Sequence, residues 1–108
     1  PYLSFEIELV ESANYTLWLE IRGHDGQSNS VHVMVDGKGL TYHAKGIGHI
    51  DYGNWKWVNS GNDVPAIELY LEEGIHDFRV IMREDGVEFS RLFIGLEDGD
   101  GPPLQLGS

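Results

Sequence analysis

Two of the three tryptophans in this chain stand one residue apart, within the stretch Gly-Asn-Trp-Lys-Trp-Val-Asn. An indole ring offers a flat apolar face, and neighbouring amide and ammonium groups offer hydrogen bonds. A sugar ring presents the complementary surface, because hydroxyl groups edge its CH-rich face. Trp55 and Trp57 therefore predict an aromatic platform for a sugar, with Trp55 as the main ring. Hydrogen bonds are expected from Asn54, Lys56 and Asn59.

The tryptophans belong to a longer segment, residues 38–63, that is rich in glycine and asparagine and has no clean hydrophobic alternation. We read it as an excursion at one end of the fold, and we expect Tyr42 and His43 to join the sugar site from it. Asp51 and Asn62 add further polar groups. The alternative for Trp57 is a structural role as a plug at the end of the core, because tryptophan is largely buried on average.

A second candidate surface comes from the strand parity of residues 17–22. Trp18, Glu20 and Arg22 alternate with apolar neighbours, so they share the opposite face of a strand. Such a face could form a second cleft. The competing interpretation is a cross-strand stack of an aromatic ring and an arginine that only covers the sheet.

Metal binding is a weaker reading of the histidines. His43, His49 and Asp51 could in principle converge on a cation, but histidine in a glycine-rich loop is more often a surface or sugar-contacting group. His24-Asp25 and His76-Asp77 are adjacent pairs, and adjacent strand residues point to opposite faces. The sequence leaves the identity of any metal ligands open.

Period-two alternation dominates the rest of the chain, and no segment carries a helical period. We predict an all-β antiparallel sandwich, with a barrel as the less favoured solution. One domain is expected over residues 1–96, followed by a glycine- and proline-bearing linker or tail over 97–108. The predicted strands cover residues 3–9, 15–21, 31–35, 67–71, 78–82 and 87–94.

The charge and composition of the chain exclude several classes of binding partner and of chemistry. The formal charge of −11 repels phosphate backbones and anionic membranes, so neither nucleic acid nor a membrane is an expected partner. No run is long enough to span a bilayer, and the lack of cysteine removes disulfides and thiolate chemistry. No nucleophile elbow, phosphate loop or zinc-protease motif is present, so we expect no catalytic activity.

Several segments in order resemble the jelly-roll β-sandwich carbohydrate-binding modules of the galactose-binding-like superfamily, which includes families 6, 32 and 35. The resemblance implies loop aromatics that flank a sugar, near Trp55 or Trp57. It also implies a first strand upstream of this sequence that carries a ligand of a structural calcium, and we expect this chain to lack that strand. The segments that carry the resemblance are residues 15–22, 30–37, 55–57, 71–76, 83–86 and 89–94.

The combined prediction is a secreted, non-catalytic module that targets an attached polysaccharide-degrading enzyme to its glycan. A neutral polysaccharide or oligosaccharide is favoured by the negative charge. A missing first strand would leave an exposed edge, and exposed edges pair with other chains, which predicts a homodimer. The alternative is a structural or adhesion sandwich of a surface protein with no sugar site.

Overall fold

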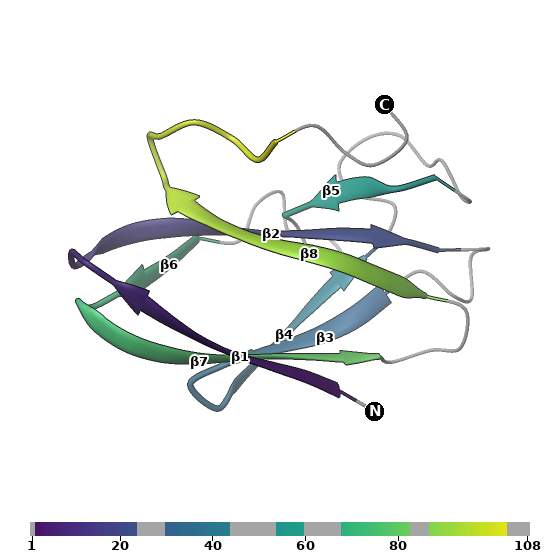
Figure 1. Cartoon of the computed structure of the whole chain (residues 1–108), viewed down its shortest axis with the longest axis horizontal. Coiled ribbons are helices and arrows are strands. Elements are labelled where there is room, and N and C mark those ends of the chain that lie inside the picture. The colour runs from purple at the N-terminus through teal and green to yellow at the C-terminus, as the bar shows by residue number, and fades with distance from the viewer. Residues whose placement is uncertain (1, 24–29, 44–53, 60–67, 83–86, 104–108) are drawn as a thin grey trace.

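The chain folds as an all-β sandwich of two antiparallel sheets, as the alternation predicted (Figure 1). This computed structural model describes residues 2–23, 30–43, 54–59, 68–82 and 87–103. No helix among them is long and apolar enough to cross a membrane. The strands are β1 (Tyr2–Leu9), β2 (Ala13–Arg22), β3 (Ser30–Val35), β4 (Lys38–His43), β5 (Lys56–Val58), β6 (Glu68–Leu71), β7 (Gly74–Met82) and β8 (Glu88–Leu96).

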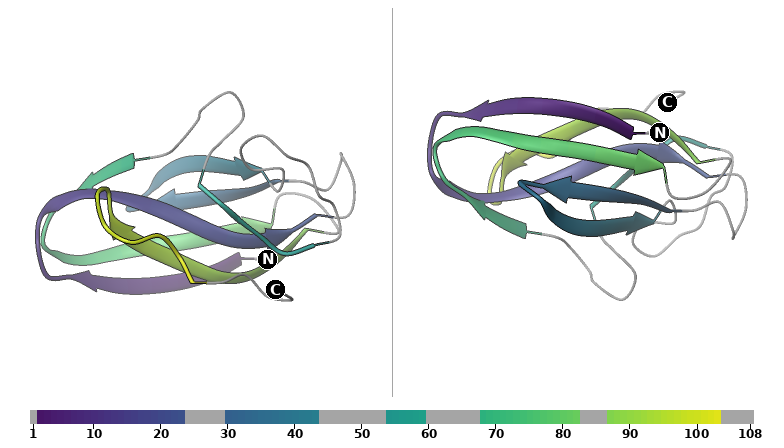
Figure 2. Two further views of the ribbon diagram at one scale, coloured as in Figure 1. Left: turned by 90° about the horizontal axis from the view of Figure 1, so that it is seen from above. Right: turned by 90° about the horizontal axis from the view of Figure 1, so that it is seen from below.

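The two sheets differ in how they are built. The first has the order β1-β7-β3-β4, which the view from below shows side by side (Figure 2). The second is organised around the long strand β2. Strand β8 pairs with residues 15–22 of β2, whereas β5 and β6 pair with separate parts of it, residues 19–21 and 13–16. Strand β2 therefore positions every other strand of its sheet.

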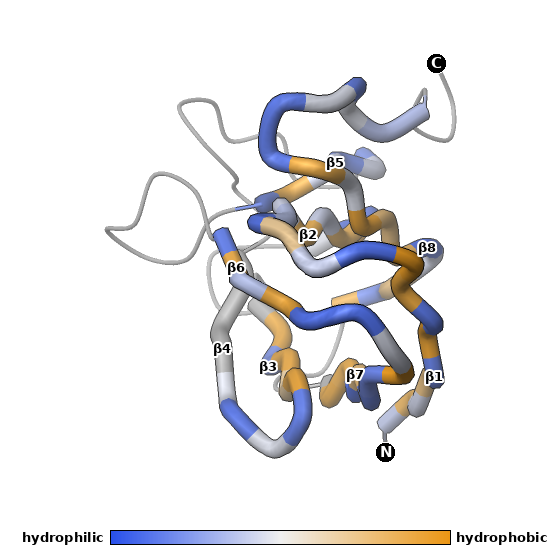
Figure 3. Tube along the Cα trace, turned by 90° about the vertical axis from the view of Figure 1, so that its left-hand side faces the viewer, coloured by the Kyte–Doolittle hydropathy of each residue, from blue (hydrophilic) through white to orange (hydrophobic). Residues whose placement is uncertain are grey.

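Hydropathy alternates along the strands (Figure 3), and the buried apolar side chains form one core cluster. Phe78 of β7 is completely buried, as are Leu17 and Leu19 of β2. Along one side of the sandwich, the Phe5 ring of β1 lies 6.1 Å from the Phe89 ring of β8, centroid to centroid. This tilted pair fills the space between the edge strands of the two sheets.

The described parts of residues 38–63, which are 38–43 and 54–59, form two strands that the sequence pattern did not predict. Strand β4 pairs with β3 through the Asp36-Gly37 turn, where both residues have positive φ (51° and 88°), as a tight hairpin requires. Strand β5 is three residues long, too short for alternation to be visible. The excursion is therefore partly sheet, and Trp57 lies on β5 and not in a loop.

Removal of the Phe78 ring should destabilise the domain strongly. Phe78→Ala leaves a cavity at the centre of the core and should lower the free energy of unfolding by about 3–5 kcal/mol. Ile75→Ala, at a side chain that is 66% exposed on the same strand, should change it by less than about 0.5 kcal/mol. Urea denaturation of both variants checks this, and equal effects would contradict the described core.

Candidate functional site

The two candidate surfaces of the sequence form one surface in the structure. Leu17, Leu19 and Ile21 of β2 are fully buried in the core, so the intervening residues face outward. Glu20 lies opposite Trp57 of β5 on one side and opposite Arg91 of β8 on the other. We call this outer face of β5, β2 and β8 the aromatic face. Its members are Trp18, Glu20, Arg22, Trp55, Trp57, Glu88, Arg91 and Phe93.

A buried carboxylate lies at the centre of the aromatic face. The Glu20 side chain is 0% exposed and accepts two hydrogen bonds from Arg91, from Nε at 2.8 Å and from Nη2 at 3.0 Å. This bond to Glu20 raises the pKa of Arg91 above its ordinary value. The guanidinium also lies 5.1 Å from the centroid of the Trp57 ring, and Phe93 meets that ring edge-on at 6.4 Å. Trp57 is thereby held against the sheet.

Glu20, Arg91 and Trp57 form one row of the aromatic face. A second, more exposed row of the same composition lies beside it and consists of Arg22, Trp55 and Glu88. Arg22 places its guanidinium 4.6 Å from the centroid of the Trp55 ring, and its Nη2 donates to Glu88 Oε2 at 2.6 Å. The side chains of Arg22 and Glu88 are 31% and 40% exposed, so solvent screens this ion pair more than the one at Glu20. Trp55 is half-buried. The row around Trp55 is therefore the more accessible part of the face.

A β-bulge in β8 brings both arginine–glutamate pairs to the same face. Glu20 pairs with Arg91, but the next residue of β2, Ile21, pairs with Phe89, so Ser90 is the extra residue. The bulge reverses the parity of the strand. Phe89 consequently packs inward against Phe5, whereas Glu88 and Arg91 both face β2 partners on the outer side.

The aromatic face ends in a small pocket of about 180 Å³ beside Trp18, Asn59 and Phe93. Residues 95–97 and 99–101 complete its wall, and the backbone amide of Glu97 anchors this segment by donating to the Asn14 carbonyl at 3.0 Å. Gly95 leaves room for the Phe93 ring here, because an added Cβ would be 2.8 Å from Phe93 Cε2. The pocket extends the face beyond the tryptophan rows.

Most of the predicted platform residues come together, but not all of them. Trp55, Trp57 and Asn59 join the strand face that the sequence had treated as separate. Lys56 has the opposite parity, since it pairs with Ile21, and Asn54 is exposed just before the strand. Neither tryptophan is a plug of the core, because both rings contact arginines of the outer face.

Other predicted residues lie elsewhere. Tyr42 and His43 belong to β4 in the opposite sheet, and the structure does not describe their side chains. His49, Asp51 and Asn62 fall outside the described residues. Within the described part of the chain, no three histidine or carboxylate side chains are grouped as a metal site would require.

Arg91, Glu88 and Phe93 were not among the residues predicted for the site. The sequence held a partial signal, since the apolar positions of the last strand are 87 and 89 and then 92 to 94, with two polar residues between. This interruption of the period-two pattern is compatible with a bulge that turns Arg91 outward, but Phe93 lies within a continuous apolar run and has no such signal.

A protonated histidine forms a second electrostatic centre, at the end of the sandwich opposite the Trp55 row. His76 Nδ1 lies 2.6 Å from Asp36 Oδ2, and His76 Nε2 lies 2.6 Å from the Glu72 carbonyl oxygen. Both oxygens only accept, so both ring nitrogens must donate, which requires the imidazolium form. The bond to Asp36 raises the pKa of His76, and the same bond lowers the pKa of Asp36.

Comparison with known proteins assigns the chain to no family. No protein-family model matches the chain, and no curated protein matches it significantly. What the structure establishes is an all-β sandwich of two antiparallel sheets, without a family assignment.

Loss of one negative charge should have very different effects in the two rows. Glu20→Gln removes a charge from two buried hydrogen bonds and should lower the free energy of unfolding by about 3 kcal/mol. Glu88→Gln makes the same chemical change in the exposed row and should cost less than about 1 kcal/mol. Chemical denaturation measures both. If Glu88→Gln were the more damaging change, the assignment of Glu20 as the anchored carboxylate would be wrong.

The pair of His76 and Asp36 should make stability depend on pH at two points. Because folding raises the pKa of His76, its contribution to the free energy of unfolding is complete below the unfolded pKa of about 6.5. This contribution is lost as the pH rises through the folded pKa. The lowered pKa of Asp36 means that its contribution is present above about 3.9 and is lost as the pH falls through the folded pKa.

The variant His76→Gln isolates this effect. Between about pH 4 and pH 6.5 it should be less stable than the parent by about 1–2 kcal/mol, a value discounted for the exposure of Asp36. The difference should shrink at alkaline pH, where the parent histidine is neutral as well. Denaturation midpoints of both proteins across this range test it, and a difference independent of pH would exclude the imidazolium.

Proposed function

We propose that this domain is a non-catalytic carbohydrate-binding module whose glycan lies on the aromatic face. The observation that carries the proposal is the position of Trp55 and Trp57 on the outer surface of β5, β2 and β8, where both are only partly buried. Had both rings been in the core, the chain would have lost its platform. The resemblance to the jelly-roll modules of families 6, 32 and 35 points to the same use.

The arrangement suits weak, surface-type recognition of a sugar chain. An arginine stacks on each tryptophan, which fixes the orientation of the ring before any ligand arrives. Preorganised rings lose little conformational entropy when they bind. Trp55 is the proposed main contact, because its row is the more exposed one. Trp18 and Asn59 extend the surface toward the pocket beside Phe93.

The charges of the face favour a neutral glycan. Arg22 is paired with Glu88 and Arg91 with Glu20, so the two cations nearest the tryptophans are balanced locally. The whole chain carries −11, which repels a polyanion at long range. A neutral polysaccharide or oligosaccharide therefore remains the proposed partner, and we propose that the domain works outside the cell.

Such a module would hold an attached polysaccharide-degrading enzyme near its substrate. This effect needs only modest affinity, because tethering raises the local concentration of the catalyst at the glycan surface. Micromolar to millimolar binding, roughly −8 to −4 kcal/mol, is enough. Pairing of two copies through the edge strand β1 or β8 remains part of the proposal.

One observation favours a second candidate, a structural or adhesion sandwich with no sugar site. Trp57 Nε1 is buried without a hydrogen-bond partner, and its ring is covered by Arg91 and Phe93. In that case the tryptophan–arginine rows only stabilise the sheet, as cross-strand pairs do. The two candidates differ in what happens when Trp55 alone is removed.

Affinity electrophoresis distinguishes the carbohydrate-binding module from the adhesion sandwich. The protein is run against soluble neutral and anionic polysaccharides, with and without calcium. Trp55→Ala should lower affinity for the bound neutral glycan about tenfold or more, roughly 1.4 kcal/mol, while the fold is retained. Tyr2→Ala is the matched control, because Arg79 lies 5.5 Å from the centroid of that ring on the opposite sheet. If no glycan retards the parent protein and Trp55→Ala only lowers stability, the adhesion candidate is correct.

A further inference from the structure

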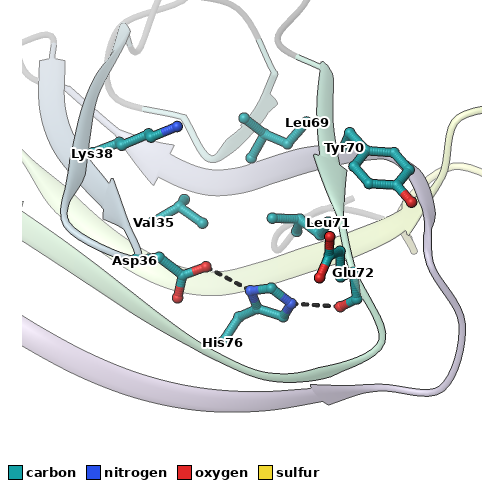
Figure 4. Close-up of a pocket in the computed structure, with 8 residues that line it drawn as sticks. All are labelled: Val35, Asp36, Lys38, Leu69, Tyr70, Leu71, Glu72 and His76. Carbon is teal, nitrogen blue, oxygen red and sulfur yellow. Dashed lines mark hydrogen bonds and ion pairs between the residues drawn. The ribbon is translucent and has the colours of Figure 1, made fainter.

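A larger pocket lies away from the aromatic face, in the gap between β4 of one sheet and β6 of the other (Figure 4). We call it the β4–β6 pocket. Its volume is about 340 Å³, which falls in the range of roughly 300–1,000 Å³ that is typical of small-molecule sites. The pocket beside Trp18 is about half as large, at 180 Å³. Size alone therefore favours the β4–β6 pocket for an entire ring.

The lining combines an apolar wall with polar groups on opposite sides. Val35, Leu69 and Leu71 form the apolar wall, and Val35 and Leu71 lie between the polar groups (Figure 4). Lys38 approaches from β4, and the row formed by His76 and its two acceptors lies opposite. A ligand here meets hydrogen-bond donors on one side, acceptors on the other and an aliphatic surface between them.

The charges of this lining cancel. Lys38 and the imidazolium of His76 are positive, whereas Asp36 and Glu72 are negative. A net charge on a ligand would therefore gain nothing here, which favours a neutral molecule with several hydroxyl groups. The CH-rich face of a sugar ring matches the aliphatic wall, and its hydroxyl rim matches the mixture of donors and carboxylate acceptors.

We propose that the β4–β6 pocket is a second glycan site, which holds one neutral sugar ring, either free or at the end of a chain. The proposal rests on the carbohydrate-binding function proposed above and extends it. An open strand face accepts the interior of a chain, whereas a half-open pocket of about 340 Å³ has room for a single ring. One domain would then engage two parts of a polysaccharide, which raises avidity.

The His76 row makes binding at this site depend on pH. The charged groups that face His76 are Asp36 from the β3–β4 turn, Glu72 from the end of β6 and Lys38 across the pocket. When the imidazolium loses a proton, one of its two acceptors loses its donor. Since these acceptors belong to different sheets, the wall of the pocket loosens and binding should weaken.

Two substitutions test the pocket and leave the hydrogen bonds of His76 to Asp36 and to the Glu72 carbonyl in place. Lys38→Met removes the donor on one side. Glu72→Gln removes the carboxylate charge on the other and leaves intact the main-chain carbonyl that His76 uses. Each should lower affinity at the pocket roughly tenfold, because hydrogen bonds from or to charged groups are the strong ones. Trp55→Ala should leave binding at the pocket unchanged.

Amide chemical shifts of the whole protein, recorded during titration with methyl glycosides of neutral sugars and then with oligosaccharides, distinguish the sites. Shifts at residues 35–38 and 69–76 report the pocket, and shifts at residues 18–22 and 55–59 report the aromatic face. A methyl glycoside that shifts the pocket identifies a free ring, and an effect seen only with oligosaccharides identifies a chain end. The pocket shifts should weaken as the pH rises through the raised pKa of His76 and the ring becomes neutral.

Each outcome decides between the two proposals. Shifts on the aromatic face with none at the pocket overturn this inference and leave the proposed function intact. Pocket shifts that persist unchanged in Lys38→Met and Glu72→Gln also overturn it. Pocket shifts without any on the aromatic face support the second site and reject Trp55 as the platform. If no sugar shifts either region, both proposals are wrong.

Discussion

A carboxylate without access to water, at the centre of a sheet face, is the constraint on which the candidate site depends. Glu20 is completely buried, and an ion taken out of water is stable only when strong hydrogen bonds replace its hydration. The planar guanidinium of Arg91 supplies two such bonds. The same guanidinium stacks on Trp57, so solvation of one charge also fixes the orientation of a ring. The hydrogen bonds that Glu20 requires therefore fix Arg91, and through Arg91 they fix the Trp57 ring on the aromatic face.

The second electrostatic centre links the two sheets. His76 lies on β7 of the first sheet, accepts no hydrogen bond, and donates to Asp36 beside it and to the carbonyl of Glu72 at the end of β6 in the second sheet. A backbone bond from Asp77 to Asp36 Oδ1 fixes the turn further. One imidazolium ring therefore connects the β3–β4 hairpin, β6 and β7. This centre connects the two sheets, whereas the two arginine–glutamate pairs join β2 and β8 within one sheet.

These two centres define two regions with different ligand geometry. The aromatic face is open and built from stacked rings, which suits a chain lying across it. The β4–β6 pocket is a half-open cavity lined by aliphatic and charged groups, and its volume suits a single ring. In both regions the cations are balanced by carboxylates, and this local neutrality, within a chain of strongly negative total charge, is the feature common to both proposals.

The sequence by itself determined the fold class, because period-two alternation can be buried only by strands that pair into sheets. It also placed Trp18, Glu20 and Arg22 on one outer face, since parity along a strand is local. Tertiary structure alone decided that Trp55 and Trp57 join that face, because a three-residue strand has no readable period and its partner is distant in sequence. The same holds for Arg91 with Glu20 and for His76 with Glu72 and Asp36. Which strand lies beside which is set by packing of the whole chain, and a single sequence carries no direct record of it.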